Sequence, residues 1–467
     1  MIDDNRGRAV LDPPYRTVLD PPYRTVLKPY GHALVKLARQ RPEIVCLSGD
    51  LTRQCEIDLF QAAFPDRFIH AGMAEANMIG VAGALARSGL IPFVHTFGVF
   101  ATRRPLDQIV NAVAYPRLPV RLVGFMPGVS SPGGPSHQAI EDVALMRALP
   151  GMTIVDVADA TETAQVVAAI ADLPGPVYLR LKRGEIPVIF PEDHQLSLDH
   201  AQLLVDGRAE TRLAAGTAGG GVTTGGGVTR GGADTRGGGV TRGGAHTVGR
   251  GGTKGGGVSS GGAETAGGAH TVGRAVTVGG SDTRGGGVTV GGAHTVGRGG
   301  IGEWAASVAG AADHAGTPEA VPGSDVSLLV SGMMVAPALA AARVLRSAGI
   351  ATVVLNIPVI KPLDAATVLA VAAASQTVIT AENHSIIGGL GSAVAEVLAE
   401  SGLSRPLHRI GLNDTFAEGA KTAAYLFHKY GLTVQHLIDT TWSALDRPGT
   451  PPRSQPVPAE EGEYSPV

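Results

Sequence analysis

Residues 219–296 follow a six-residue repeat of the form GG-x-x-T-x, and this tract limits what the rest of the chain can fold into. Units such as GGGVTR, GGADTR and GGAHTV place Val, Asp or His where a hexapeptide β-helix needs a constant apolar side chain. With so little apolar surface to bury, the tract cannot offset about 1 to 2 kcal/mol of backbone entropy per residue. We therefore expect a Gly-rich disordered linker over residues 205–322, with a linker that binds a partner as the alternative.

Both ends of the chain also have the composition of unfolded segments. The octapeptide LDPPYRTV occurs twice in succession, at 11–18 and 19–26, and its proline pairs disfavour helices and central strands. After residue 445 the chain is rich in proline and glutamate. The expected organisation is a flexible leader over 1–27, a first domain over 28–192, the linker over 205–322, a second domain over 323–444 and a disordered tail over 445–467.

Strand-like runs alternate with helical patterns in both folded blocks, which predicts an α/β fold with two domains. In the first block the expected strands cover 43–50, 67–72, 91–97, 120–125, 153–157 and 177–181. In the second, smaller block they cover 326–332, 352–358, 377–382 and 407–412. Because strands separated by helices need crossover connections, each block should form a mainly parallel sheet covered by helices.

Composition excludes several classes of protein. Lysine and arginine number 38 against 41 aspartates and glutamates, so the net charge of −3 offers no basic surface for nucleic acid or an anionic membrane. No run approaches the roughly 18 apolar residues of a membrane span, and the N-terminus lacks a signal-peptide core. Cys46 and Cys55 are too few for a disulfide framework and lack zinc-site spacing. We expect a cytoplasmic protein without metal ligands of its own.

Glu75 stands at the start of a helical pattern, directly after an expected strand. In HAGMAEANMIGVAGALARSGL, Met78, Val81 and Leu85 fall on one stripe, so a helix over 74–88 should pack on the sheet. A carboxylate in the first turn can simply complement the helix dipole. The small apolar residues around it and its place at a strand's carboxyl end favour a ligand-binding role, because open α/β sheets bind ligands at that edge.

Two further candidate elements follow. In HTFGVFATRRPLDQI, Phe97, Phe100 and Arg103 are spaced by three, and on a helix they would line one flank. Such a flank could stack on a planar heterocycle and hold an anion, although core aromatics beside a solvated arginine are the simpler interpretation. In SSPGGPSHQAIED, His137 follows a Gly/Pro loop at the start of a helix, where a capping or surface role is the simpler alternative.

Together these stretches resemble a known family. GDLTRQ, FIHAGMAEANMIGVAGALARSGLIPFVHTFGVFATRRPLDQIVNAVAY, GGPSHQAIEDVALMRALPGM and GPVYLRLKR resemble the pyrimidine-binding domain of transketolases. ITAENHSIIGGLGSAVAEVLAE and GLNDTFAEGA resemble the transketolase C-terminal domain. The resemblance covers residues 28–190 and 325–443 and leaves out the leader, linker and tail.

The resemblance implies thiamine diphosphate as the cofactor. In this family the glutamate that matches Glu75 hydrogen-bonds N1′ of the aminopyrimidine and favours the imino tautomer that removes the thiazolium C2 proton. Phe100 would stack on the pyrimidine, with Phe97 beside it, and Asp50 would lie near the cofactor. Arg103 takes a place where many transketolases carry Tyr and some relatives carry Arg, so it is a candidate for both cofactor and substrate contact.

The resemblance also implies the substrate contacts. His137 matches a histidine that donates to, or exchanges protons with, the ketose oxygens, and Arg183 matches an arginine that binds substrate phosphate. Two positions depart from the family, because Met126 replaces a phosphate-contacting His and Gly133 replaces a hydroxyl-contacting Asp. Each lost contact could cost about 1.5 to 3 kcal/mol of binding. An altered ketose or keto acid donor is therefore expected in place of the standard pentose phosphates.

The chain lacks the G-D-G motif and following Asn with which this family binds Mg²⁺ and the diphosphate. The resemblance therefore implies the C-terminal half of a split transketolase, with a separate N-terminal subunit that supplies those contacts in an α2β2 heterotetramer. The implied reaction transfers a two-carbon ketol unit from a ketose to an aldehyde through a thiamine-bound carbanion.

Three other functions stay open. DQIVNAVAY also resembles the β subunit of 2-oxo acid dehydrogenases, and Arg103 resembles deoxyxylulose-phosphate synthases. The altered loop and long linker would also suit a non-catalytic partner that scaffolds or regulates another subunit. The GPSHQ block favours a transketolase over the first two, and the presence of Glu75, Phe97 and Phe100 favours catalysis over the third.

Overall fold

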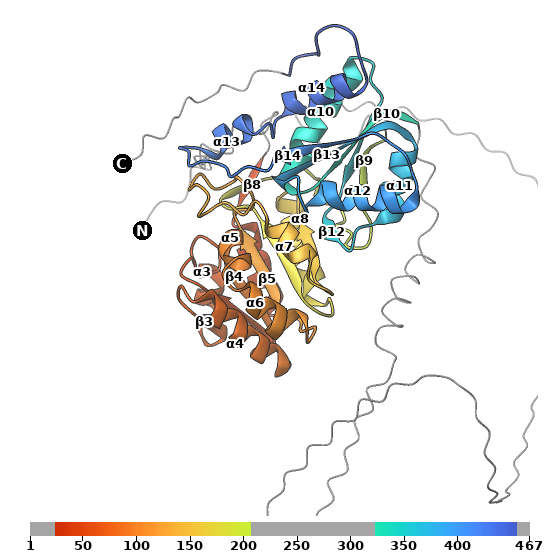
Figure 1. Ribbon diagram of the computed structural model, residues 1–467. Helices are drawn as coiled ribbons and strands as arrows, with labels where there is room; N and C mark the ends of the chain where they lie inside the picture. The colour runs from red at the N-terminus through yellow and green to blue at the C-terminus, as the bar shows by residue number, and fades with distance from the viewer. Residues whose placement is uncertain (1–23, 207–322, 455–467) are drawn as a thin grey trace, which may run out of the picture. The chain divides into compact units, whose positions relative to one another are not determined.

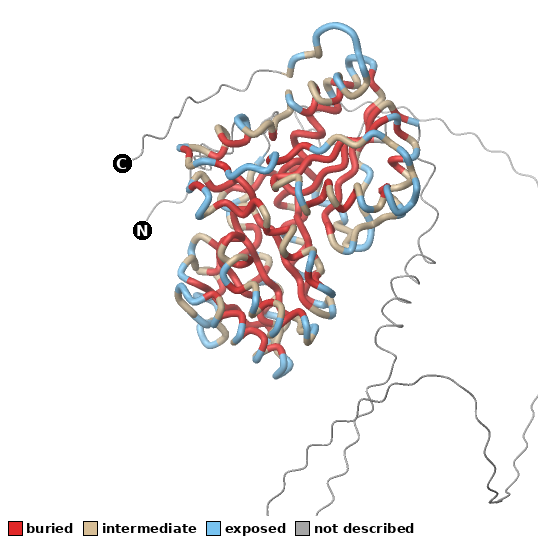
Figure 2. The backbone as a smooth tube through the Cα atoms, in the orientation of Figure 1, coloured by how far each residue is buried: buried red, intermediate tan, exposed pale blue. Residues whose placement is uncertain are grey.

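The computed structural model describes residues 24–206 and 323–454, which form two α/β domains (Figure 1). The predicted two-domain α/β class is confirmed. Most of the expected leader, linker and tail lies outside the described residues. Figure 2 shows that the buried backbone is concentrated in the strands at the centre of each domain.

The first domain is built on a seven-stranded sheet in the order β12-β6-β7-β5-β4-β2-β3. Its strands are β2 (Ile44–Ser48), β3 (Phe68–His70), β4 (Ile91–Phe97), β5 (Arg121–Phe125), β6 (Thr153–Asp156), β7 (Val177–Leu181) and β12 (Val359–Lys361). Every neighbouring pair is parallel except β12 with β6. The carboxyl ends of β2, β3, β4, β5 and β7 therefore meet at one edge of the sheet.

Helices cover both faces of this sheet. They are α2 (Pro29–Ala38), α3 (Asp58–Ala63), η1 (Pro65–Arg67), α4 (Glu75–Arg87), α5 (Gly98–Thr102), α6 (Leu106–Gln108), the π-helix η2 (Ile109–Ala114), α7 (Asp142–Arg147) and α8 (Ala160–Ala171). Strand alternation divides the core, because Ile44 and Cys46 pack with α2 and α8, whereas Val45 and Leu47 pack with α4 and η2. Helix α8 begins with a reciprocal cap: Asp159 accepts from the Glu162 N–H, and Glu162 accepts from the Ala158 N–H.

The buried face of α4 differs from the predicted stripe. It is formed by Met78, Ile79, Ala82, Gly83 and Ala86. Val81 and Leu85, which the stripe assigns to the sheet, are only partly buried. The reason is the close approach of η2, since a Cβ on Gly83 would lie 2.5 Å from the carbonyl oxygen of Ala112. The helix is thus rotated so that its small residues meet η2.

The second domain has a five-stranded sheet in the order β14-β13-β10-β11-β9. Its strands are β9 (Gln202–Asp206), β10 (Ser324–Val330), β11 (Thr352–Asn356), β13 (Ser375–Ser385) and β14 (Leu407–Leu412), and only β9 pairs antiparallel. Its helices are η3 (Gly332–Met334), α10 (Val335–Ser347), α11 (Ala365–Ala373), α12 (Leu390–Ser401), α13 (Ala423–Lys429) and α14 (Val434–Ala444). Helices α10 and α14 pack on one face, and α11 and α12 pack on the other.

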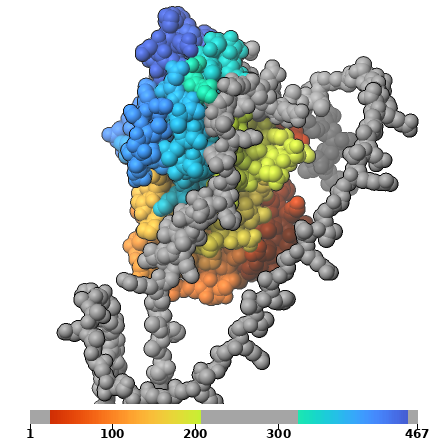
Figure 3. Space-filling model, turned by 90° about the vertical axis from the view of Figure 1, so that its right-hand side faces the viewer, coloured from red at the N-terminus to blue at the C-terminus, as the bar shows by residue number. Residues whose placement is uncertain are grey.

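The two domains exchange edge strands. β9 follows the first domain in sequence but pairs with β11 of the second, whereas β12 follows β11 but pairs with β6 of the first. A further pair joins β1 (Thr25–Leu27) to β8 (Glu185–Pro187). Figure 3 shows the residues of the second domain, in teal to blue, directly against those of the first, in orange to yellow.

Three expected boundaries differ from those in the structure. β1 lies within the expected leader, and β9 includes two residues of the expected linker, 205 and 206. At the other end, Ser454 donates its N–H to Gln435 of α14 at 2.9 Å, so part of the expected tail packs on the second domain. Among the described helices, none is long and apolar enough to cross a membrane.

Candidate functional site

The candidate residues gather at the carboxyl edge of the first sheet, where the loops after successive parallel strands meet. Asp50 follows β2, Glu75 begins α4 after β3, and Phe97 ends β4. Met126 follows β5, and Arg183 follows β7. The order of the strands in the sheet, and not their order in the chain, brings these loops together.

Glu75 is buried, with 3% of its surface exposed, at the first position of α4. Its Oε1 accepts a hydrogen bond of 2.5 Å from Nη1 of Arg104, whose own side chain is 48% exposed. A buried carboxylate needs such a partner, because removal from water without one is costly. Arg104 is not among the predicted site residues, although it is the second arginine of the TRRP run.

Phe100 lies at the centre of the cluster. Its ring is 6.1 Å from that of Phe97, at an interplanar angle of 15°. The guanidinium carbon of Arg104 is 4.0 Å from the centroid of the Phe100 ring, and the ring of His137 meets it edge-on at 5.4 Å. The structure therefore brings together four of the predicted residues: Glu75, Phe97, Phe100 and His137.

Arg103 points to a different partner. Its guanidinium forms a bidentate pair with Glu141 and donates to the carbonyl oxygens of Pro135 at 2.9 Å and Gln138 at 3.0 Å. The hydrogen bond to Glu141 raises the pKa of Arg103. Arg103, the residue directly after α5, therefore holds the loop that carries His137.

Asp50 and Arg183 are exposed, and each follows a strand at the same edge. Within the described ranges, neither makes a hydrogen bond to another side chain. Burial raises the pKa of the Cys55 thiol well above its usual value, and the charges of Glu56, Arg183 and Asp50 also act on it.

The structure shows what surrounds Met126 and Gly133, the two positions that depart from the family pattern. Met126 is 7% exposed, packs in the first-domain core and has a backbone φ of 60°. A Cβ on Gly133 would lie 2.9 Å from the Cβ of His137, so any side chain there would displace the histidine. The loop between them is also held by the second domain, because Gln138 donates to the Glu418 carbonyl at 3.0 Å and Pro132 accepts from Ala420 at 2.9 Å.

A buried polar network lies beside this loop and joins the domains. Arg180 of β7 is 1% exposed and donates to Asp142 and Asp156, each at 2.8 Å, and to the Asn383 carbonyl at 3.0 Å. Burial opposes the charge of Arg180, but the two carboxylates hold its pKa above the usual value. Tyr178 also donates to Asp142, at 2.7 Å. Every charge in this network is paired, which indicates a structural role.

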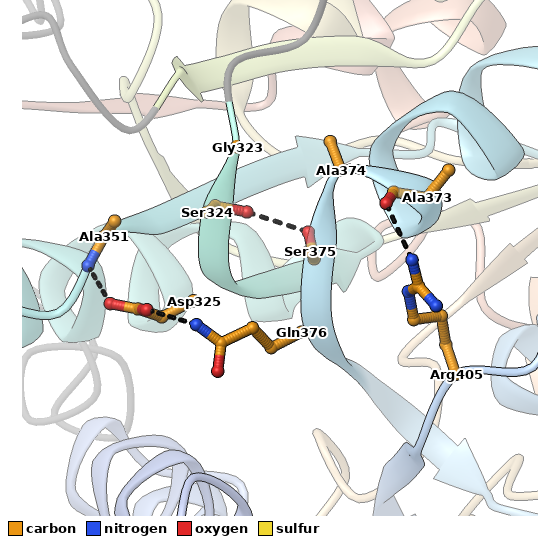
Figure 4. Close-up of a pocket in the computed structure, with 9 residues that line it drawn as sticks. All are labelled: Gly323, Ser324, Asp325, Ala351, Ala373, Ala374, Ser375, Gln376 and Arg405. Atoms are coloured by element: carbon orange, nitrogen blue, oxygen red, sulfur yellow. Dashed lines mark hydrogen bonds between the residues drawn. The ribbon is translucent and has the colours of Figure 1, made fainter.

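A separate pocket of about 550 Å³ lies at the amino ends of the second-domain strands (Figure 4). Its lining residues are Gly323, Ser324, Asp325, Ala351, Ala373, Ala374, Ser375, Gln376 and Arg405. The polar groups bond to one another, as Ser324 does to Ser375 at 2.8 Å and Gln376 does to Asp325 at 2.7 Å. Although the buried Nε of Arg405 has no partner among the described residues, these hydrogen bonds occupy the other polar side chains named here, so this pocket is a weaker candidate than the carboxyl edge. In the part of the chain that the structure describes, no group of three or more His, Cys, Asp or Glu could hold a metal ion.

The protein has two α/β domains. The first carries a buried carboxylate beside aromatic rings at the carboxyl edge of its sheet. The family model described as transketolase, pyrimidine binding domain, matches residues 24–188, and that of transketolase, C-terminal domain, matches 317–437. The chain belongs to the transketolase family, and the prediction of this family is confirmed.

Individual relatives agree with this assignment. An uncharacterized transketolase family protein of Sinorhizobium fredii is 33% identical over 421 residues, which cover 89% of this chain and 88% of the relative. A 6-deoxy-6-sulfo-D-fructose transketolase subunit of Clostridium sp. is 30% identical, over 90% of this chain and 94% of the relative. A solved structure described as a split gene transketolase, inactive beta4 tetramer, is 30% identical with a TM-score of 0.60, over 90% of this chain and 97% of that one.

Proposed function

We propose that this chain is the C-terminal subunit of a split transketolase. It transfers a two-carbon ketol unit from a ketose donor to an aldehyde acceptor and uses thiamine diphosphate as its cofactor. The observation that carries this proposal is the buried carboxylate of Glu75, which lies in one cluster with the rings of Phe97, Phe100 and His137. Relatives of nearly the same length that are named as transketolase subunits support it.

The residues of the cluster fit an aminopyrimidine. Glu75 would hold N1′ by accepting a hydrogen bond from it when this nitrogen carries a proton, and Phe100 would stack on the planar ring with Phe97 behind it. Thr96 precedes Phe97 in β4, and its buried hydroxyl has no hydrogen-bond partner among the described residues, so a polar group is available there. When bound, thiamine diphosphate supplies the nucleophilic carbon that carries the two-carbon unit.

The substrate side is assigned to His137 and Arg183. The His137 ring is half-buried and oriented by Phe100 and by Ser136, whose hydroxyl lies 2.9 Å from its Nδ1, so its other nitrogen can exchange a proton with a ketose oxygen. Arg183 is exposed after β7 and would attract an anionic substrate group, while Asp50 stays a candidate for contact near the cofactor. Arg103 acts on the substrate indirectly, through the loop of His137.

The donor is proposed to differ from the usual pentose phosphates. Met126 is directed into the core and offers no hydrogen bond, and Gly133 leaves room for His137 but not for an aspartate beside it. The relative from Clostridium, which is named for a sulfonated ketose, supports the idea that subunits of this type accept different ketoses. A ketose or keto acid without the two missing contacts is the expected class.

Mg²⁺ and the diphosphate would be held by a separate N-terminal subunit, in an α2β2 assembly. The similar split-gene structure, which is described as an inactive tetramer of β subunits, supports this division. Cofactor binding by the present chain alone should therefore be weak.

Ketol transfer by the reconstituted assembly tests this function. The chain would be purified with its N-terminal subunit, supplied with thiamine diphosphate and Mg²⁺, and assayed across a panel of phosphorylated, sulfonated and unmodified ketoses. We expect transfer from at least one donor and its loss in Glu75→Ala, whereas Arg87→Ala, which removes an exposed charge at the far end of α4, should keep it. Equal turnover by wild type and Glu75→Ala would contradict the proposal.

A further inference from the structure

Arg104 makes two contacts with the proposed cofactor site, and both use groups that the aminopyrimidine would need. Its Nη1 donates to Oε1 of Glu75 at 2.5 Å. Its guanidinium carbon lies 4.0 Å from the centroid of the Phe100 ring, within cation–π distance. One side chain therefore engages both the carboxylate assigned to N1′ and the ring assigned to stacking.

The chemistry of the guanidinium explains why it can take the place of an aminopyrimidine at Glu75 and Phe100. A guanidinium is planar, carries N–H donors in its plane and stacks on aromatic faces. An aminopyrimidine is also planar, and its ring nitrogen N1′, when protonated, presents an N–H at its edge. The two groups satisfy the same pair of partners, so they compete for Glu75 and Phe100.

We propose that Arg104 is a stand-in for the cofactor's aminopyrimidine, and that the cofactor binds when this guanidinium leaves Glu75 and Phe100. This inference rests on the proposed function. The different exposure of the two partners supports it: Glu75 is 3% exposed and fixed in α4, whereas the Arg104 side chain is 48% exposed and can turn into water. The stand-in keeps the buried carboxylate paired until the cofactor arrives.

The neighbouring arginine cannot take the same role. Arg103 is occupied by Glu141 and by two carbonyl oxygens of the loop that carries His137. Removal of Arg104 should thus free Glu75 and Phe100 together, without a second arginine to replace it. The affinity for an aminopyrimidine should then rise. In wild type only the molecules in which Arg104 has left Glu75 and Phe100 can bind it, whereas without Arg104 every molecule can.

The test measures binding of 4-amino-5-(hydroxymethyl)-2-methylpyrimidine, the pyrimidine part of thiamine, to the full chain by calorimetry. We expect Arg104→Ala and Arg104→Met to bind it about threefold to tenfold more tightly than wild type. Arg87→Ala is the matched control for loss of one positive charge and should leave the affinity unchanged. Adding Glu75→Gln to Arg104→Ala should abolish the gain.

The same measurements can overturn the inference. An Arg104 variant that binds the pyrimidine no more tightly than wild type, including one that does not bind it, would show that the arginine does not compete. Thermal unfolding of each variant would show whether a loss reflects misfolding, and Arg104→Met keeps the side-chain length for that reason. Ketol transfer by the assembly tests the proposed function separately. If transfer depends on Glu75 but the Arg104 variants bind the pyrimidine as wild type does, the proposed function stands and only the role of Arg104 is rejected.

Discussion

At the scale of single residues, two neighbouring arginines have different partners. Arg103 donates to the loop of His137, whereas Arg104 donates to Glu75. The sequence predicted the cluster of Glu75, Phe97, Phe100 and His137 through motif and resemblance. It did not show the pairing of Arg104 with Glu75, because these residues are 29 positions apart in the chain and no local spacing relates them.

Arg103→Ala tests the role of the loop. Without its bonds to Glu141, Pro135 and Gln138, the loop should move and His137 should lose its position, so kcat should fall about tenfold or more. The Kd for thiamine diphosphate should change less than twofold, and Arg103→Lys should recover only part of kcat because it lacks the planar fork. A loss in cofactor affinity equal to the loss in kcat would instead place Arg103 at the cofactor.

Two buried titratable residues predict an unusual pH dependence of stability. Burial raises the pKa of Glu56 from 4.5 to about 7, so the stability that its proton provides is complete below pH 4.5 and is lost as the pH rises through about 7. Burial lowers the pKa of His95 from 6.5 to about 4, so stability is lost there as the pH falls from 6.5 towards 4. The two effects oppose each other over nearly the same range.

Glu56→Gln should separate these effects. Its free energy of unfolding, relative to wild type, should increase by about 3 kcal/mol between pH 4.5 and pH 7.5, since one pKa unit corresponds to about 1.4 kcal/mol. Denaturant unfolding at several pH values measures this difference. Glu43→Gln is the control, because hydrogen bonding to Arg41 lowers the pKa of Glu43, and the stability that it provides is lost as the pH falls below 4.5. A difference between Glu56→Gln and wild type that does not vary with pH would contradict the assignment.

At the scale of elements, local patterns predicted the parallel strands but not the strands exchanged between the domains. The expected strands are apolar runs bounded by turns. Because the strands at the centre of each sheet are buried on both faces, nearly all their residues are apolar, and such runs can be recognised in the sequence. β9 and β12 are short edge strands whose partners lie far along the chain. Their pairing depends on how the domains pack, which no local pattern contains.

Arg180→Met should destabilise the junction of these elements strongly. The change would leave Asp142 and Asp156 as buried carboxylates without their cation, at a cost of about 3 to 5 kcal/mol in unfolding free energy. Arg24→Met removes an arginine from an exposed ion pair with Glu192 and should change stability by less than about 1 kcal/mol. Similar small losses in the two variants, measured by denaturant unfolding, would show that the buried network is not essential.

At the scale of the whole molecule, the ends of the chain on either side of residues 207–322 can be placed by sheet register. Asp206 of β9 pairs with Val353 of β11, which pairs with Ser327 near the start of β10. Two strand spacings separate β9 from β10, or about 10 Å, which a few extended residues can span. The sheet therefore does not require the long Gly-rich tract.

Replacing residues 207–322 with about ten Gly and Ser residues should leave the fold intact. We expect an unchanged midpoint of cooperative unfolding, assembly with the N-terminal subunit and ketol transfer within about threefold of wild type, since a flexible chain of that length reaches across the gap. A milder deletion, of residues 219–296 alone, should behave in the same way. Loss of assembly in both would show that the tract does more than connect the domains.

The most direct test of the central claim concerns the role of Glu75 toward the cofactor. The exchange rate of the thiamine C2 proton with deuterium can be followed by nuclear magnetic resonance in the assembly, without any substrate. We predict that Glu75→Gln slows this exchange by about 100-fold or more while Arg87→Ala does not. Equal exchange rates in wild type and Glu75→Gln would contradict the assigned role of this carboxylate.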